Sequence, residues 1–309
     1  MYLYLPVALT SINALMPVGL GFAVGLLSGL FGVGGGFLMT PLLIMLGIPA
    51  TVAAATDSNQ IVAASTSGTY AHWKLGNVDF KMGLYLLAGS LLGGALGVQL
   101  IKLLKAMGNA DFVIQITYVV MLGGVGGYMF FESLSQIRKN KQASGKTVEA
   151  PAGDSAMKKF LASLPMQTEF SRSGVTHSTL IPVILGAFVG ILAAIMGVGG
   201  GFLMVPVMVY MLRMPMHAVV GTSLFLVLFT CIEVTFLQAY TNHTVDFILA
   251  VLLLGGSVVG AQIGTIFGRK LKGEQLKILL AVIVLAVTVK MVFDLTLTPH
   301  LLLAQGGGH

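Results

Sequence analysis

Long stretches without any charged side chain dominate this sequence. Asp57 is the first charged residue of the chain, and Asp, Glu, Lys and Arg are also absent from windows 82–101, 112–131, 176–212 and 247–268. A helix of about 20 apolar residues is long enough to cross the roughly 30 Å hydrocarbon core of a bilayer. Charged residues make up 9% of the chain, whereas a soluble domain has about 25%. The sequence therefore predicts an all-α integral membrane protein that crosses the bilayer many times.

A ten-residue glycine-rich motif occurs twice. Residues 32–41 read GVGGGFLMTP, and residues 197–206 read GVGGGFLMVP. Three successive glycines disfavour a regular helix, because each costs about 1 kcal/mol relative to alanine. They also let the backbone bend sharply and come close to a ligand. Helix breaks at matching positions in two halves of a chain are typical of a transporter binding site.

The repeat extends over the whole membrane part. Thr56 corresponds to Thr222, and Val78–Phe80 corresponds to Val245–Phe247. We expect apolar segments at 14–31, 37–48, 50–71, 79–101 and 111–132 in the first half, and at 178–196, 202–212, 216–240, 246–268 and 275–297 in the second. The second segment of each half is short, so we expect a broken helix there. The predicted organisation is a first transmembrane repeat at 1–132, a cytoplasmic linker at 133–177, a second repeat at 178–298 and a tail at 299–309.

The distribution of Lys and Arg predicts the orientation, because these residues accumulate in cytoplasmic loops. With the basic central linker inside, five spans per half also place the basic residues of 269–277 inside, and only Lys102 and Lys105 fall on the opposite side. Eight spans, with the short segments as re-entrant loops, would put the 269–277 group outside. We therefore expect two repeats of five segments. An odd number makes the repeats inverted in topology.

Glycines recur along the fourth segment of each half at spacings of three and four residues. They are Gly89, Gly93, Gly94 and Gly97 in the first half, and Gly256, Gly260 and Gly264 in the second. This spacing places them on one helix face, where small residues allow two helices to approach closely. We expect these glycines to serve helix packing.

The paired glycine motifs, the sequences Thr56–Ser58 and Gly221–Ser223 that follow them, and the glycine-spaced fourth segments resemble the TauE/SafE family of sulfite exporters. This family is also called the toluene sulfonate uptake permease family. The resemblance covers the chain except for the linker and the tail. It implies a transporter of a small sulfur-containing anion, such as sulfite or an organosulfonate, in the bacterial cytoplasmic (inner) membrane.

An anion site is predicted where the two glycine motifs meet. Backbone N–H groups at a helix start carry a partial positive charge and attract oxyanions. Nearby hydroxyl groups would add donors, although Ser and Thr in helices often bond to their own backbone, and the glycines could instead serve close packing. The candidate substrate-binding residues are Gly34, Gly35, Gly36, Phe37, Thr56, Gly199, Gly200, Gly201, Phe202, Thr222 and Ser223.

Two acidic residues lie well inside predicted segments. Asp57 stands where the second half has Ser223, and Glu233 lies in the eighth segment. A carboxylate inside a membrane is costly when charged, so it usually faces a cavity and has a function. Either could carry a coupling proton; the alternative is a structural carboxylate held by polar neighbours.

The predicted function is a secondary transporter, expected to be an exporter, that works by alternating access. The sequence has no nucleotide-binding motif, so an ion gradient or the membrane potential would supply the energy. A channel-like anion facilitator, a membrane scaffold and an intramembrane enzyme are the alternatives, but we find no nucleophile–base set. Cys231 is the only cysteine. We expect no metal, no cofactor and no nucleic acid, and the sequence does not predict an oligomeric state.

Overall fold

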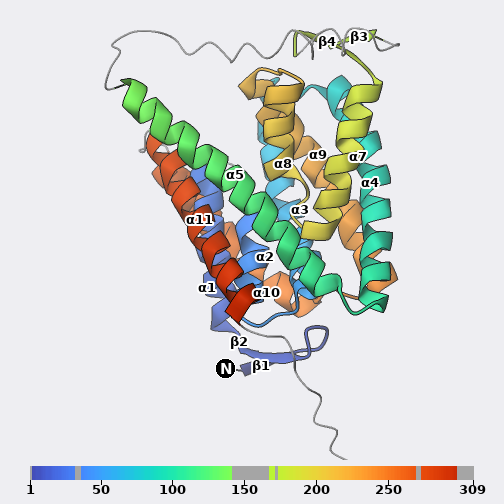
Figure 1. Cartoon of the computed structure of the whole chain (residues 1–309), viewed down its shortest axis with the longest axis vertical. Helices are drawn as coiled ribbons and strands as arrows, with labels where there is room; N and C mark the ends of the chain where they lie inside the picture. The colour runs from blue at the N-terminus through green and yellow to red at the C-terminus, as the bar shows by residue number, and fades with distance from the viewer. Residues whose placement is uncertain (1, 32–35, 141–166, 171–172, 269–272, 298–309) are drawn as a thin grey trace, which may run out of the picture.

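A computed structural model describes residues 2–31, 36–140, 167–170, 173–268 and 273–297, and these are mostly helical (Figure 1). Gly34, Gly35, most of the expected linker and the tail at 299–309 lie outside the described residues. The first half contains β1 (Tyr2–Leu5), β2 (Thr10–Asn13), α1 (Leu15–Phe31), α2 (Gly36–Met45), α3 (Ala50–Lys74), α4 (Phe80–Ala106) and α5 (Ala110–Asn140).

The second half repeats this order of elements. It contains β3 (Gln167–Phe170), β4 (Val175–Ser178), α7 (Leu180–Met196), α8 (Gly201–Pro206), the π-helical turn η1 (Val207–Met211), α9 (Met216–Leu237), the π-helical turn η2 (Gln238–Asn242), α10 (Phe247–Gly268) and α11 (Gly273–Leu297). Each predicted apolar segment corresponds to one of these helices. The helix α5 continues to Asn140, beyond the position where we expected the linker to begin.

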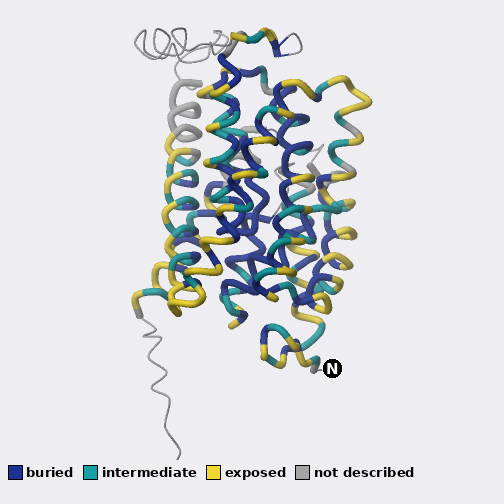
Figure 2. Tube along the Cα trace, turned by 90° about the vertical axis from the view of Figure 1, so that its right-hand side faces the viewer, coloured by how far each residue is buried: buried dark blue, intermediate teal, exposed yellow. Residues whose placement is uncertain are grey.

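Within the described residues, four stretches of helix are long and apolar enough to cross a membrane: Phe80–Ala106, Ala110–Tyr128, Ala218–Asn242 and Phe247–Gly264. Shorter apolar helices lie at Leu15–Ser28, Gly36–Met45 and Leu180–Met196. Large apolar side chains remain exposed on the outside of the bundle, such as Leu92 and Leu96 of α4. Figure 2 shows the exposed residues along the outer helices and the buried ones in the interior. Lipid would cover these outer faces, as expected for an integral membrane protein.

The glycines of the fourth helices lie in close contacts between the halves, which confirms the packing prediction. A Cβ atom added at Gly93 of α4 would lie 2.0 Å from the carbonyl oxygen of Ala187 in α7. One added at Gly256 of α10 would lie 2.1 Å from the carbonyl oxygen of Val18 in α1. Only glycine permits such backbone approach. Thus α4 packs on α7, and α10 packs on α1.

The contacts also give the direction of each helix. Gly21 of α1 faces Leu253, and Gly25 faces Ser257, so α1 and α10 run parallel. Between α3 and α9 the numbering runs in opposite senses: Gly68 faces Leu224, whereas His72 faces Gly221, so these two helices are antiparallel.

A β-hairpin begins each half, and sequence reasoning missed both. Figure 1 shows β1–β2 and β3–β4 at opposite ends of the bundle. Asp79 accepts hydrogen bonds from the backbone N–H of Met82, at the start of α4, and from the backbone N–H of Ser173 in the second hairpin. Asp246 has the same role at the start of α10: it accepts from the backbone N–H of Leu249 and of Val7 in the first hairpin.

Lys105, which contradicted the expected charge distribution, has a local partner. Its Nζ atom donates to the carbonyl oxygen of Asn242, 2.9 Å away, at the end of η2. The last carbonyl groups of a helix have no intrahelical donor and carry a partial negative charge. This contact therefore gives Lys105 a reason to be at this end of the bundle that is independent of topology.

Candidate functional site

The second glycine motif forms the predicted helix break. Gly197 has a φ of 71° and ends α7, with its N–H bonded to the carbonyl oxygen of Ala193 at 2.8 Å. Gly199 and Gly200 also have positive φ values, 66° and 75°. Residues with a side chain rarely adopt this left-handed conformation. The chain then enters α8 at Gly201. In the first half, α1 ends at Phe31 and α2 begins at Gly36.

The two motifs meet inside the bundle. The rings of Phe37 and Phe202, which occupy equivalent positions in the two copies, are stacked with centroids 4.6 Å apart and planes 13° apart. Both side chains are buried. The structure therefore brings together residues that are far apart in the sequence, as the site prediction required.

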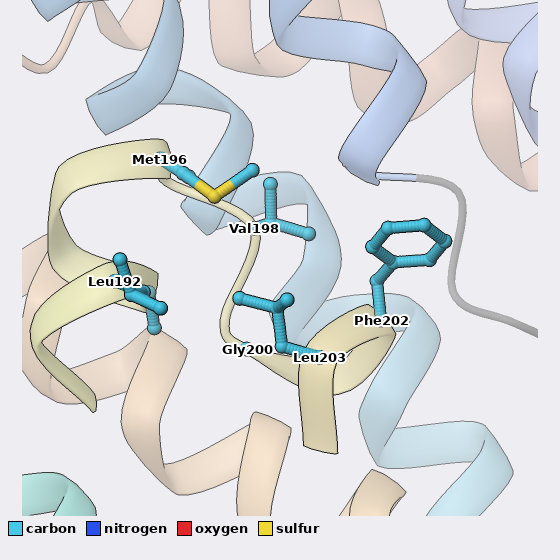
Figure 3. Close-up of a pocket in the computed structure, with 7 residues that line it drawn as sticks. Leu192, Met196, Val198, Gly200, Phe202 and Leu203 are labelled. Atoms are coloured by element: carbon cyan, nitrogen blue, oxygen red, sulfur yellow. The ribbon is translucent and has the colours of Figure 1, made fainter. Parts of the chain in front are cut away.

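A narrow apolar hollow lies beside the second break (Figure 3). Its lining comes from the end of α7 and the start of α8: Leu192, Ala193, Met196, Val198, Gly200, Phe202 and Leu203. The hollow has no room for a water molecule. The second glycine break is thus covered by apolar side chains in this conformation.

Asp57 lies fully buried against the start of α2. Its Oδ2 atom accepts a hydrogen bond from Thr40 Oγ1 at 2.8 Å, and a Cβ atom added at Gly36 would lie 3.5 Å from the same oxygen. Its Oδ1 atom has no hydrogen-bond partner among the described residues. Among the described residues, the one salt bridge joins Lys290 to Asp294, so no basic side chain forms an ion pair with Asp57. Burying an ionised carboxylate without a counter-ion is costly, so a charge on Asp57 would need further hydrogen-bond donors.

Two hydroxyl groups of the first half contact the end of α7. The fully buried side chain of Tyr118, in α5, donates its O–H to the carbonyl oxygen of Met196. Ser58 Oγ donates to the carbonyl oxygen of Gly197 at 2.9 Å and also lies 3.2 Å from the carbonyl oxygen of Ala54 in its own helix. Sequence reasoning missed Tyr118 because its role depends on how α5 crosses the bundle (Figure 1). Its only sequence signal is a polar atom within an apolar segment.

Thr56 and Thr222 connect the two halves. Thr56 Oγ1 accepts from the backbone N–H of Asp246 at 3.1 Å, and Thr222 Oγ1 accepts from the backbone N–H of Asp79 at 3.0 Å. Each hydroxyl retains a hydrogen that it can donate. Ser223 Oγ donates to the carbonyl oxygen of Val220 within its own helix, at 3.0 Å. The three predicted hydroxyl donors thus all have contacts within the protein.

Glu233 is half-buried on α9 and faces α4. A Cβ atom added at Gly94 would lie 2.8 Å from Glu233 Oε2. This oxygen has no hydrogen-bond partner among the described residues. Cys231, two residues earlier on α9, faces the second glycine break instead, since a Cβ atom added at Gly199 would lie 2.2 Å from its Sγ atom. Asp57 and Glu233 therefore occupy different surroundings.

No group of three or more His, Cys, Asp or Glu side chains within the described ranges could hold a metal ion. A buried contact between Phe37 and Phe202 of the two glycine motifs, a buried carboxyl group and apolar helices with exposed outer faces indicate a polytopic membrane protein with the organisation of a transporter.

The comparison with protein families agrees with this class. The profile of the family described as "Sulfite exporter TauE/SafE" matches residues 18–291. This protein belongs to the TauE/SafE sulfite exporter family, a family of membrane transporters.

Similar proteins occur in bacteria and plants. The "Probable membrane transporter protein YjnA" of Bacillus subtilis is 26% identical over 88% of this chain and 97% of its own length. The "Probable membrane transporter protein YunE" of the same organism is 25% identical over 90% of this chain and 96% of its own length. The "Sulfite exporter TauE/SafE family protein 3" of Arabidopsis thaliana is 30% identical over 37% of this chain and 28% of its own length. No solved structure matches the chain significantly.

Proposed function

We propose that this protein is a secondary transporter that exports a small sulfur-containing anion, such as sulfite or an organosulfonate, by alternating access of two inverted repeats. The observation that carries this proposal is the meeting of the two glycine motifs through the stacked rings of Phe37 and Phe202. The family description supports the class of substrate. An ion gradient or the membrane potential would drive transport, because the sequence contains no nucleotide-binding motif.

The helix contacts support inverted repeats. The equivalent helices α3 and α9 pack antiparallel, and so do α5 and α11, where Gly126 faces Val284 and Gly123 faces Thr288. The first helix of each half packs on the fourth α-helix of the other half, α1 on α10 and α7 on α4. A twofold axis in the membrane plane would produce this pattern, because it reverses the direction of each element.

The anion would bind between the starts of α2 and α8. The first N–H groups of a helix have no intrahelical acceptors and lie at the positive end of its dipole. On this proposal, the N–H groups of Gly34–Phe37 and Gly199–Phe202 hold the substrate, with Thr56, Thr222 and Ser223 nearby. The closed apolar hollow then belongs to an occluded conformation, and the site opens when the Phe37–Phe202 contact separates.

The flux of a panel of sulfur-containing anions into proteoliposomes tests the function. We expect saturable flux of sulfite or an organosulfonate, whereas a channel-like facilitator would give flux that does not saturate. Gly200→Ala should abolish substrate binding, because it places a side chain at a φ of 75°, where a Cβ atom would lie 2.7 Å from Val189 Cγ1.

Gly47→Ala is the matched control for backbone strain. Gly47 has a φ of 86° in a turn, but nothing lies within 4 Å of an added Cβ atom. Both variants should lose the roughly 1–2 kcal/mol that a left-handed residue costs, and only Gly200→Ala should lose binding. Native affinity in a folded Gly200→Ala protein would show that the anion binds elsewhere.

Cysteine labelling tests the inverted repeats. Leu75 follows α3 and His243 follows η2, so they occupy similar positions in the two halves, and both are exposed. We expect Leu75→Cys and His243→Cys to react with an impermeant thiol reagent from opposite sides of the membrane. The native Cys231 is buried and gives a low background. Labelling of both positions from the same side would reject this topology.

A further inference from the structure

The end of α7 is fixed to the first half by two hydrogen bonds. The last carbonyl groups of a helix have no intrahelical donors, and here Tyr118 and Ser58 supply donors to Met196 and Gly197. The backbones are also in close contact, since a Cβ atom added at Gly197 would lie 2.0 Å from the carbonyl oxygen of Ala54. Movement of the break between α7 and α8 therefore requires these bonds to change.

Tyr118 also comes close to Asp57: its O–H binds Met196, while Ser58, the residue after Asp57, binds the adjacent Gly197. Asp57 Oδ2 already accepts from Thr40, whereas Oδ1 has no partner in the described structure. If Asp57 loses its proton, the buried carboxylate requires a further donor, because an ionised group without hydrogen bonds is strongly disfavoured in an apolar interior. A tyrosine has one O–H group. Tyr118 cannot donate to Met196 and to Asp57 at the same time.

We propose that Tyr118 is a positioning residue that couples the charge of Asp57 to the helix break at Gly197. While Asp57 is protonated, the Tyr118 O–H holds the Met196 carbonyl group and the break stays closed. When the Asp57 proton leaves to the transport pathway, Tyr118 keeps its own hydrogen but donates it to Asp57 Oδ1, and the end of α7 is released. This inference rests on the proposed function, in which an ion gradient drives transport, and it adds that Asp57 carries the coupling proton.

The surroundings of Asp57 contain few other groups that could produce a pH response. Tyr118 from α5 comes near Asp57 through Met196, and Cys231 from α9 packs with Ile61, one turn after Asp57 on α3. Asp246, at the start of α10, binds the neighbouring Thr56 and uses its oxygens for Val7 and Leu249. Asp111, at the start of α5, accepts from the N–H of Thr51. The helix α2 contributes Thr40, and the α7 end contributes backbone carbonyl groups.

The native Cys231 provides a direct measurement of opening, because its Sγ atom lies against Gly199 in the break. The experiment uses the full chain in proteoliposomes without substrate and measures alkylation of Cys231 by a small neutral maleimide between acidic and alkaline pH. Dividing the intrinsic rate, taken from the denatured chain at the same pH, by the rate in the folded protein gives a protection factor. This ratio removes the pH dependence of thiol reactivity itself.

We expect the protection factor of the wild-type protein to fall with rising pH as Asp57 ionises. The change should be roughly two- to tenfold, the range that one hydrogen bond produces in an equilibrium. Tyr118→Phe keeps the ring and removes the donor, so its protection should be low at every pH. Tyr128→Phe, an exposed position on the same helix, should behave as wild type. In Asp57→Asn, the protection factor should stay at every pH at the value that the wild-type protein has at acidic pH.

A Tyr118→Phe protein that keeps the wild-type pH response would overturn the proposal, and so would a wild-type protein with none. If Tyr118→Phe does not fold, the Asp57→Asn variant decides, since a pH response that persists without the carboxyl group contradicts the mechanism. The measurement involves no sulfur-containing anion. A failure of the proposed substrate would therefore leave this result intact, and the two hypotheses can fail separately.

Discussion

Gly256→Val will prevent stable packing of α10 on α1, whereas Gly255→Val in the same helix will be tolerated. A Cβ atom at Gly256 would lie 2.1 Å from the carbonyl oxygen of Val18 and 2.8 Å from the nitrogen of Phe22. Both are backbone atoms, so no side-chain rotation relieves the overlap and the two helices must separate. Overpacking usually costs about 1–3 kcal/mol, and we expect a loss at or above the top of this range.

The neighbouring glycine makes the test specific. Nothing lies within 4 Å of a Cβ atom added at Gly255, so Gly255→Val measures the helix propensity of valine without the packing conflict. Thermal unfolding in detergent, with the yield of monodisperse protein, gives the comparison. Equal stabilities of the two variants would contradict the assignment of the glycine-lined face to helix contact.

Asp57→Asn will remove the proton-driven part of transport while substrate still binds. A pH difference of one unit is worth about 1.4 kcal/mol for each transported proton, which corresponds to an accumulation ratio of about tenfold with one coupled proton. Asparagine keeps the shape of the side chain and an acceptor for Thr40, but it cannot carry a proton. We therefore expect the accumulation ratio driven by a pH gradient to fall to about one in this variant.

Glu233→Gln is the matched control and also tests the second acidic residue. Glu233 faces Gly94 of α4, away from the contact between the glycine motifs, and it is only half-buried. Flux is measured with and without a pH gradient in the same proteoliposomes. An unchanged pH response in Asp57→Asn would assign the coupling role elsewhere, and its loss in Glu233→Gln alone would assign it to Glu233. Tighter anion binding in Asp57→Asn would instead show that the carboxylate repels the substrate and assists its release.

The sequence determined the class of the protein and the positions of its helices. Charge-free windows are a local property, and a window long enough to cross the bilayer must form a helix because no water is available to its backbone groups. The glycine motif was equally informative: three glycines in succession predicted a break between α7 and α8, and Gly197, Gly199 and Gly200 have the positive φ values that explain them. The glycine-lined faces of α4 and α10 followed from spacing alone.

Only the tertiary structure decided what the polar side chains contact. Thr56 and Thr222 look like equivalent donors in the sequence. In the fold each accepts a hydrogen bond from the backbone N–H of an aspartate that precedes a helix of the other half, Asp246 for Thr56 and Asp79 for Thr222. Lys105 contradicted the charge rule until its carbonyl partner at Asn242 was known. The two β-hairpins, which complete the repeat, have no strong local signal because each is stabilised by a distant aspartate.

The meeting of Asp57, Tyr118 and the end of α7 likewise depends on the crossing of α5 over the bundle. A hydrogen bond between a tyrosine and a carbonyl group 78 residues away leaves no periodic trace in the sequence. Burial and helix periodicity are set by neighbours along the chain, so they can be predicted from it. The partners of a buried hydroxyl or carboxyl group are set by which helices pack together, and that is determined when the two halves associate.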